Sequence, residues 1–254
     1  MSKITFLKHF SDFINNLLNS LGYNATFHQY SKNSNYEVIT PVANYAPWNI
    51  DDDFNDIYNK IKNYTFVDKY RLYELWQIIG ETTKIPGAFI EIGVWRGGSG
   101  ALIRRKADLC GIKDKIYLCD TFEGIVKTDS EKDPDLKDGM FNDTSVEIVE
   151  DLIYKKLKLE NVEILKGIFP EETKELITDN MFRFCHIDVD IYQSAKDIVN
   201  WIWDKMPKGG IIVYDDYGFE GCIGITKFVD EEREKSDRIV IHNLNGHAIV
   251  IKID

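Results

Sequence analysis

From residue 88 to residue 215, short apolar runs alternate with amphipathic stretches of helical period. Apolar runs of this length are typical of strands that are buried on both faces of a sheet. They predict strands at 88–93, 115–120, 161–166, 181–188 and 210–215, and the stretches between them predict helices near 98–110, 146–158, 171–178 and 194–205. Strands that alternate with helices indicate a parallel sheet with crossover connections. We therefore expect an α/β fold.

The chain closes on two further apolar runs, 238–242 and 247–251, with Asn245-Gly246 between them. Two such runs around an Asn-Gly turn predict an antiparallel hairpin. Alternating strand and helix units followed by an antiparallel hairpin are the order of a class I methyltransferase-type, Rossmann-like sheet. We expect this domain to cover residues 81–254, with residues 1–80 forming an amino-terminal helical and lid segment.

Near the amino end, apolar residues recur every three or four positions, which predicts an amphipathic helix with one apolar stripe. The stripe consists of Phe6, Phe10, Phe13, Ile14, Leu17, Leu18 and Leu21. It must pack against the same chain or against a second copy, so a homodimer or higher homo-oligomer is one of two hypotheses. Residues 24–44 are polar and predict an irregular connection.

Two other segments are candidates for covering a ligand. The loop 123–145 is long for a connection between a strand and a helix, and such loops at the carboxyl edge of a sheet are typically lids. Thr144 and Glu147 have the spacing of a capping box that would start the next helix. The segment Tyr45-Ala46-Pro47-Trp48 is either a second lid or a core anchor.

Composition and charge narrow the class of protein. A chain of 254 residues suits one large α/β domain, and its net charge of -11 argues against nucleic-acid binding. No apolar run approaches the roughly 20 residues that span a bilayer, and the first ten residues lack the features of a secretory signal. We expect a cytoplasmic protein that acts on small molecules. The cysteines have no metal-binding spacing and are expected to be reduced core thiols: Cys110, Cys119, Cys185 and Cys222.

Aspartate pairs end two of the predicted strands. Asp188 and Asp190 close the run 181–188, and Asp215 and Asp216 close the run 210–215. Carboxyl ends of neighbouring parallel strands face the crevice in which α/β sheets bind ligands. Clustered carboxylate oxygens suit a hard divalent cation, so the sequence predicts a reactive metal site. His186, inside the same run, is expected to be a satisfied core histidine.

A glycine-rich turn follows the first predicted strand, in Phe89-Ile90-Glu91-Ile92-Gly93-Val94-Trp95-Arg96-Gly97-Gly98-Ser99-Gly100. Glycines let backbone approach a ligand closely, and the next helix offers free N–H groups. The spacing does not fit a dinucleotide fingerprint, and Ser99 stands where a P-loop needs lysine. What remains is E-x-G-x-x-x-G, from Glu91, Gly93 and Gly97, the turn that binds S-adenosylmethionine.

Asp120 ends the second predicted strand, where a carboxylate can accept hydrogen bonds from both ribose hydroxyls of a nucleoside. The same acid serves NAD enzymes, so Asp120 alone discriminates weakly. Together with the glycine turn it favours the methyl donor.

These motifs closely resemble the macrocin and novobiocin family of sugar O-methyltransferases. The resemblance runs from about residue 45 to the end, and the matching strings are Tyr45-Ala46-Pro47-Trp48, Gly87 to Ser99, Asp120-Thr121-Phe122-Glu123-Gly124, Gly167-Ile168-Phe169-Pro170, His186 to Tyr192 and Tyr214-Asp215-Asp216-Tyr217-Gly218. The resemblance implies transfer of the methyl group of S-adenosylmethionine to a hydroxyl of a sugar or glycoside, with the help of Mg²⁺.

The resemblance also implies roles for single residues. Asp188, Asp215 and Asp216 would ligate the cation, and Asp190 would act as general base. Tyr45 to Trp48 and the loop 123–145 would cover the acceptor. Cofactor contacts are implied for Thr65, Glu91, Ser99, Asp120, Ser145 and Gly167.

Three alternatives stay open at this point. A catechol-type O-methyltransferase uses a similar acidic metal site on a planar vicinal diol. A non-catalytic S-adenosylmethionine-binding protein would need no cation beside the methyl group. An NAD-dependent oxidoreductase shares the ribose carboxylate but lacks its glycine spacing here.

Overall fold

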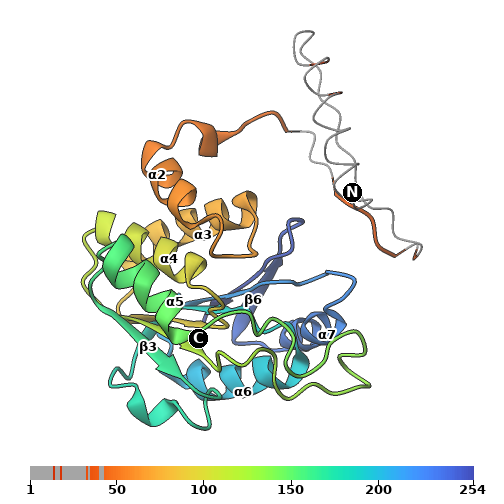
Figure 1. Cartoon of the computed structure of the whole chain (residues 1–254). Coiled ribbons are helices and arrows are strands. Elements are labelled where there is room, and N and C mark those ends of the chain that lie inside the picture. Colours follow the sequence, from red (N-terminus) through yellow and green to blue (C-terminus); the bar gives the residue numbers. More distant parts are fainter. Residues whose placement is uncertain (1–13, 15–17, 19–32, 34, 40–42) are drawn as a thin grey trace. The chain divides into compact units, whose positions relative to one another are not determined.

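The computed structural model describes residues 14, 18, 33, 35–39 and 43–254, and the chain divides into two units, Met1–Val42 and Ala43–Asp254 (Figure 1). Of the predicted amino-terminal stripe only Ile14 and Leu18 belong to the described residues, and both are helical and partly buried. The rest of that stripe and most of the connection 24–44 lie outside the described residues. All that follows concerns the second unit.

The second unit is built on a seven-stranded sheet in the order β3-β2-β1-β4-β5-β7-β6. The first five strands pair in parallel, and β7 pairs antiparallel with both β5 and β6. The strands are β1 (Ala88–Ile92), β2 (Ile116–Asp120), β3 (Val162–Lys166), β4 (Phe182–Ile187), β5 (Ile211–Tyr214), β6 (Arg238–His242) and β7 (Ala248–Lys252). The predicted α/β fold, mostly parallel with an antiparallel hairpin at the carboxyl end, is confirmed.

Helices cover both faces of this sheet, with α2 to α5 on one side and α6 and α7 on the other (Figure 1). Side chains of the central strands alternate between the two cores because successive residues of a strand point to opposite faces. Phe89 and Phe184 pack with the first group of helices, while Ile90 and Cys185 pack with the second. Burial on both faces is why these strands are mostly apolar in the sequence.

The helices mostly follow the predicted ranges, and their bounds place the loops that form the site. They are η1 (Pro47–Asn49), α2 (Asp52–Ile61), α3 (Lys69–Glu81), η2 (Thr82–Lys84), α4 (Gly98–Leu109), α5 (Val146–Glu150), the π-helical turn η3 (Asp151–Lys156), η4 (Lys174–Leu176), α6 (Tyr192–Ile202), η5 (Trp203–Lys205) and α7 (Ile223–Glu232). The carboxylates of Asp51 and Asp68 cap α2 and α3 by accepting hydrogen bonds from backbone N–H groups of their first turns.

Three helix predictions were wrong in detail. The helix near 171–178 is only the 3₁₀ turn η4, because Thr173 is the one fully buried side chain there and a longer helix would have no apolar face to pack. The cap of α5 is Ser145 and not Thr144, whose hydroxyl instead donates to the carbonyl of Trp95. Helix α6 starts at Tyr192, two residues before the predicted range 194–205.

Helix α7 was not predicted, although its buried residues Ile225, Phe228, Val229 and Glu232 have helical spacing.

The cap of α6 comes from a distant segment of the chain. The buried carboxylate of Asp133, in the loop 123–145, accepts a hydrogen bond from the backbone N–H of Tyr192 at 3.0 Å. The loop 123–145 is thereby fixed to the start of α6, next to the end of β4.

Candidate active site

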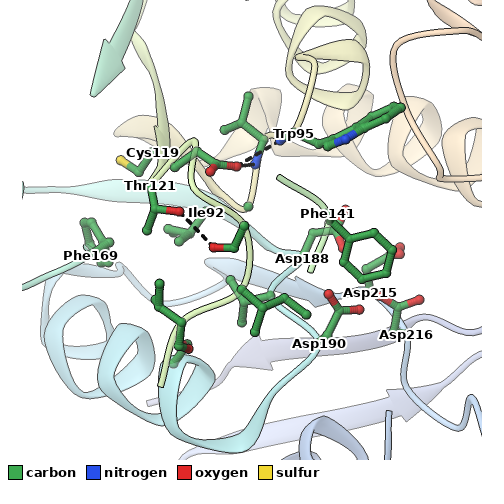
Figure 2. Close-up of a pocket in the computed structure, with 18 of the residues that line it drawn as sticks. Ile92, Trp95, Cys119, Thr121, Phe141, Phe169, Asp188, Asp190, Asp215 and Asp216 are labelled. Carbon is green, nitrogen blue, oxygen red and sulfur yellow. Dashed lines mark hydrogen bonds between the residues drawn. The ribbon is translucent and has the colours of Figure 1, made fainter. Parts of the chain in front are cut away.

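A cavity of about 300 Å³ opens at the carboxyl ends of β1, β2, β4 and β5. Nine of the site residues predicted from the sequence line it, and Figure 2 shows the four aspartates turned toward one another on one side. The nine are Thr65, Gly93, Ser99, Asp120, Gly167, Asp188, Asp190, Asp215 and Asp216. Glu91, Gly97, Ser145, Tyr45 and Trp48 are not among its lining residues.

The glycine turn brings the two halves of the site together. Gly93 has φ 88°, and a Cβ on it would lie 1.7 Å from the backbone oxygen of Asp188. Only glycine therefore allows the end of β1 to lie directly beside the residue that ends β4. Gly97, with φ 88°, starts helix α4 without a side-chain cap. The N–H of Gly98 donates to the carbonyl of Tyr64 at 2.9 Å, and the next N–H groups of the first turn, those of Ser99 and Gly100, have no side-chain cap.

Asp120 fixes the shape of this turn. Its Oδ2 accepts hydrogen bonds from the backbone N–H groups of Val94 at 2.6 Å and Trp95 at 2.9 Å. Its Oδ1 accepts one from the N–H of Phe122 at 2.7 Å. The carboxylate lines the cavity, so it can present remaining lone pairs to a ligand while it holds the turn in place.

Glu91 lies below the cavity and contacts another buried side chain. It is fully buried, and its Oε1 lies 2.8 Å from Nδ1 of His186. Burial lowers the pKa of His186, but the nearby carboxylates of Asp215 and Glu91 outweigh this and raise it to about 10. His186 is thus a core histidine as expected, but it is incompletely satisfied, since its Nε2 has no hydrogen-bond partner within the described residues.

The carboxylates of Asp188, Asp215 and Asp216 offer oxygens that lie within 4.8 Å of one another. Asp190 and Asp216 both have left-handed backbone, with φ 62° and 60°. Such strained backbone is typical of functional sites, because the surrounding structure must hold it in place. The predicted convergence of these side chains at the sheet edge is what the structure shows.

The charge of the cluster is partly balanced by an arginine that the sequence did not reveal. The guanidinium of Arg71, from α3, forms an ion pair with Asp215 and contacts Oδ1 of Asp216 at 3.3 Å. It also donates from Nε to Oδ2 of Asp68 at 2.8 Å. The only sequence signal is a charged residue on the apolar face of α3, next to Leu72, and this does not reveal which carboxylate it meets.

A histidine from the hairpin turn also reaches Asp215. Nε2 of His247 lies 2.7 Å from Oδ1 of Asp215, and its Nδ1 lies 2.6 Å from Oε2 of Glu74. His247 is fully buried. No local sequence pattern indicated either Glu74 or His247, because each is far along the chain from the carboxylate that they support.

The surroundings divide the four carboxyl groups into two kinds. Burial raises the pKa of Asp188 and of Asp216 well above the ordinary value, and the charge of Asp215 adds to this. Burial is also the main cause of the raised pKa of Asp190. Burial acts in the same direction on Asp215, but hydrogen bonds from histidine and the charge of Arg71 outweigh it and lower its pKa. Asp215 is therefore the carboxylate that this chain keeps ionised, while the others favour a proton or a cation.

Aromatic side chains form one rim of the cavity. The rings of Phe66 and Trp95 lie 4.0 Å apart between centroids, and Phe141 of the loop 123–145 lies 5.8 Å from Phe66. Phe66 is 64% exposed and Phe141 is 45% exposed, although both line the cavity. Asp143 holds this rim together, since its carboxylate accepts hydrogen bonds from Nε1 of Trp95 and from Arg96, both at 2.8 Å.

In the segment proposed as a second lid, neither Tyr45 nor Trp48 lines the cavity. Tyr45 is exposed, whereas Trp48 packs edge-on against Tyr70 and Tyr73, with centroid distances of 5.1 and 5.9 Å. Trp48 also contacts the core that covers the first face of the sheet. Of the two roles left open by the sequence, the described contacts of Trp48 are those of a core anchor.

Comparison with known proteins places this arrangement in a family. The profile of the macrocin-O-methyltransferase (TylF) family matches residues 49–245, which is more than half of the chain. The chain belongs to the macrocin-O-methyltransferase family. The resemblance noted in the sequence is thereby confirmed, and the protein is a methyltransferase by family.

Individual relatives are distant. The chain is 27% identical over 184 residues to demethyldecarbamoylnovobiocin O-methyltransferase of Streptomyces niveus, covering 68% of this chain and 69% of that one. It is 23% identical over 146 residues to 8-demethyl-8-(2,3-dimethoxy-α-L-rhamnosyl)-tetracenomycin-C 4′-O-methyltransferase of Streptomyces olivaceus, covering 54% of this chain and 56% of that one.

Among solved structures, the O-methyltransferase NovP is similar with a TM-score of 0.66 and 24% identity, covering 75% of this chain and 83% of NovP. At this level of identity the likeness shows the fold, which is the class I methyltransferase sheet expected from the order of strands. Within the described residues, no helix is long and apolar enough to cross a membrane.

Proposed function

We propose that this protein transfers the methyl group of S-adenosylmethionine to a hydroxyl of a sugar or glycoside, with Mg²⁺ bound at Asp188, Asp215 and Asp216. The observation that carries the proposal is that the acidic cluster and the glycine turn line one cavity. The two sites touch through the contact of Gly93 with Asp188, so a methyl donor on the turn would lie next to the carboxylates. The name of the tetracenomycin relative specifies a rhamnosyl group, which supports a sugar acceptor.

The residues present fit a hard divalent cation. Three carboxylates with converging oxygens are the donor set that Mg²⁺ prefers, and the raised pKa values of Asp188 and Asp216 are those of carboxyl groups crowded together without enough positive charge. Arg71 supplies only part of that charge. The three proposed ligands offer only oxygen atoms, which argues against a soft metal.

The residues that would bind S-adenosylmethionine line the other half of the cavity. Thr65, Ser99 and Gly167 line it together with Asp120, whose position at the end of β2 suits the ribose of a nucleoside. Glu91 would act indirectly, by supporting His186 below the turn, since it does not line the cavity.

In the proposed reaction, Asp190 would accept the proton of the acceptor hydroxyl, so that the oxygen could bond to the methyl carbon while the sulfonium of the donor becomes a neutral thioether. Burial raises the pKa of Asp190, which makes it a better base than an ordinary aspartate. When bound, S-adenosylmethionine supplies the electrophilic methyl group and Mg²⁺ increases the acidity of the hydroxyl. The protein contributes by holding the reacting groups in a row and by keeping water out beneath the loop 123–145.

The aromatic rim favours one second candidate. Phe66, Trp95 and Phe141 would also suit the flat ring of a catechol, which carries two neighbouring hydroxyls. A catechol-type O-methyltransferase would methylate catechols and leave every glycoside unchanged.

The test is a methyl-transfer assay with S-adenosylmethionine, a panel of glycosides and nucleotide sugars, and a catechol, each with Mg²⁺ and with a chelator. We expect turnover of a glycoside that the chelator abolishes and added Mg²⁺ restores. Tight cofactor binding by calorimetry without Mg²⁺-dependent turnover of any acceptor would refute the proposal and support a non-catalytic binding protein.

A further inference from the structure

Asp215 is the most tightly held carboxylate of the cluster. Its Oδ1 faces Nε2 of His247 at 2.7 Å, and its Oδ2 contacts the guanidinium of Arg71. The side chain is almost fully buried, so water does not compete for either oxygen. Its two oxygens therefore have different partners, and only Oδ2 faces a positive group that lines the cavity.

Behind His247 lies a second carboxylate. Nδ1 of His247 is 2.6 Å from Oε2 of Glu74, which also accepts a hydrogen bond from Nδ2 of Asn245 at 3.1 Å, while its Oε1 accepts one from Nδ2 of Asn243. The backbone N–H of His247 donates to Oδ1 of Asn245 at 3.1 Å. The two ring nitrogens of His247 are therefore fixed in direction, Nδ1 by Glu74 of α3 and Nε2 by Asp215.

We propose that Glu74 and His247 are positioning residues that orient Asp215 for the cation. His247 holds Oδ1, which prevents rotation of the carboxylate and leaves Oδ2 on the side of Arg71, which lines the cavity. Glu74 holds the imidazole in the rotamer that reaches Asp215. The inference rests on the proposed metal role of Asp215, and it assigns a function to the hairpin turn that the methyl-transfer chemistry does not by itself require.

The physical reason is the cost of organising a carboxylate at the moment of binding. A buried carboxylate without a fixed partner can rotate. The entropy lost in ordering it then lowers the affinity for the cation. Hydrogen-bond partners of metal ligands remove this cost, and their loss typically weakens metal affinity by about 10- to 100-fold. The contacts that run from the carboxylate of Glu74 through the imidazole of His247 to the carboxylate of Asp215 are an arrangement of this kind.

Two substitutions of His247 separate positioning from simple packing. The amide nitrogen of glutamine can occupy the place of Nε2, so His247→Gln keeps the donor to Asp215 and loses the contact with Glu74. The amide of asparagine is shorter and mimics Nδ1, so His247→Asn keeps the contact with Glu74 and loses the donor to Asp215. Both substitutions remove the same ring from the same buried place.

The experiment measures Mn²⁺ binding to the metal-free full chain by the electron paramagnetic resonance signal of free Mn²⁺. Binding of S-adenosylhomocysteine and the thermal unfolding midpoint are measured on the same samples. His242→Asn is the matched control, because His242 belongs to the same hairpin but contacts the ring of Tyr217 and not Asp215.

We expect His247→Asn to weaken Mn²⁺ binding by about 10- to 100-fold, with cofactor affinity unchanged. His247→Gln and Glu74→Gln should weaken it less, and His242→Asn should leave it as in the wild type. Equal Mn²⁺ affinity in His247→Asn, His247→Gln and the wild type would overturn the positioning role while leaving the metal site intact. Absence of Mn²⁺ binding by the wild-type protein would instead overturn the metal site and the positioning role together.

Discussion

Replacing Arg71 tests whether this chain uses a cation of its own to stabilise the acidic cluster. Arg71→Met keeps much of the side-chain length and removes the charge. The Arg71 side chain is 7% exposed, and those of its partners Asp215 and Asp216 are 3% and 16% exposed. Removing one partner of a buried ion pair costs about 3–5 kcal/mol, because it leaves a buried charge uncompensated.

For a chain of this size, about 3–5 kcal/mol corresponds to a fall of roughly 6–20 °C in the unfolding midpoint. The assay is thermal and urea unfolding of the metal-free protein, with Arg233→Met as the control. Arg233 pairs with Asp230 at 3.4 Å on the surface, where an ion pair contributes about 0–1 kcal/mol.

The loss should depend on pH and on Mg²⁺. Burial opposes the ionised form of Asp215, but the histidines and Arg71 lower its pKa, so this group stabilises the fold above the ordinary pKa near ~3.9 and loses that effect as the pH falls. The difference between wild type and Arg71→Met should therefore be largest near neutral pH and shrink below about pH 4. Because Arg71 contacts the carboxylates proposed as ligands, Mg²⁺ should raise the midpoint of the variant more than that of the wild type.

Two results would refute this reasoning. One is an Arg71→Met protein no less stable than Arg233→Met, which would mean that the buried pair is not a net stabiliser. The other is a difference that persists unchanged through acidic pH, which would mean that lost packing and not lost charge is the cause.

Four further predictions follow from the site. Asp190→Asn should abolish methyl transfer while Mn²⁺ and cofactor affinities stay near wild type; turnover at the wild-type rate would exclude it as base. Asp215→Ala should weaken metal binding, and an unchanged Mn²⁺ titration would exclude it as a ligand. Gly93→Ala should destabilise the protein by more than the about 1–3 kcal/mol of left-handed strain alone, since its Cβ would collide with Asp188; urea unfolding measures this, and a loss under 1 kcal/mol would contradict it. Asp133→Ala removes the cap of α6, at a cost of about 0.5–2 kcal/mol, and should expose the loop 123–145 to limited proteolysis; a wild-type cleavage pattern would mean that Asp133 does not anchor this loop.

The local pattern of residues was enough to predict most of the sheet. Strands such as β1 and β4 are buried at every position and mostly apolar, because helices cover both of their faces, and this preference for apolar residues is visible in a single sequence. The Asn-Gly turn predicted the hairpin, and the position of aspartates after strands predicted their convergence. Helices were harder to predict where packing against the rest of the domain decides whether a helix forms and how long it is, as at η4 and α7.

The partners within the site could not be predicted in this way. The contact of Arg71 with Asp215 joins residues 144 positions apart, and that of Glu74 with His247 joins residues 173 positions apart. Each of these side chains is unremarkable in its own segment, and their distances depend on how α3 and the hairpin turn pack onto the sheet. Glu91 shows the same limit, since its place in the glycine motif did not reveal that it faces His186 and not the cavity.

By itself, then, the sequence determined the α/β sheet, the turn that approaches a ligand and the edge at which four carboxylates meet, because each depends on residues close together in the chain. Only the tertiary structure decided which of those carboxylates is held ionised and by which partners. The physical reason is that burial and charge compensation depend on every element packed around a group, and those elements come from opposite ends of the domain.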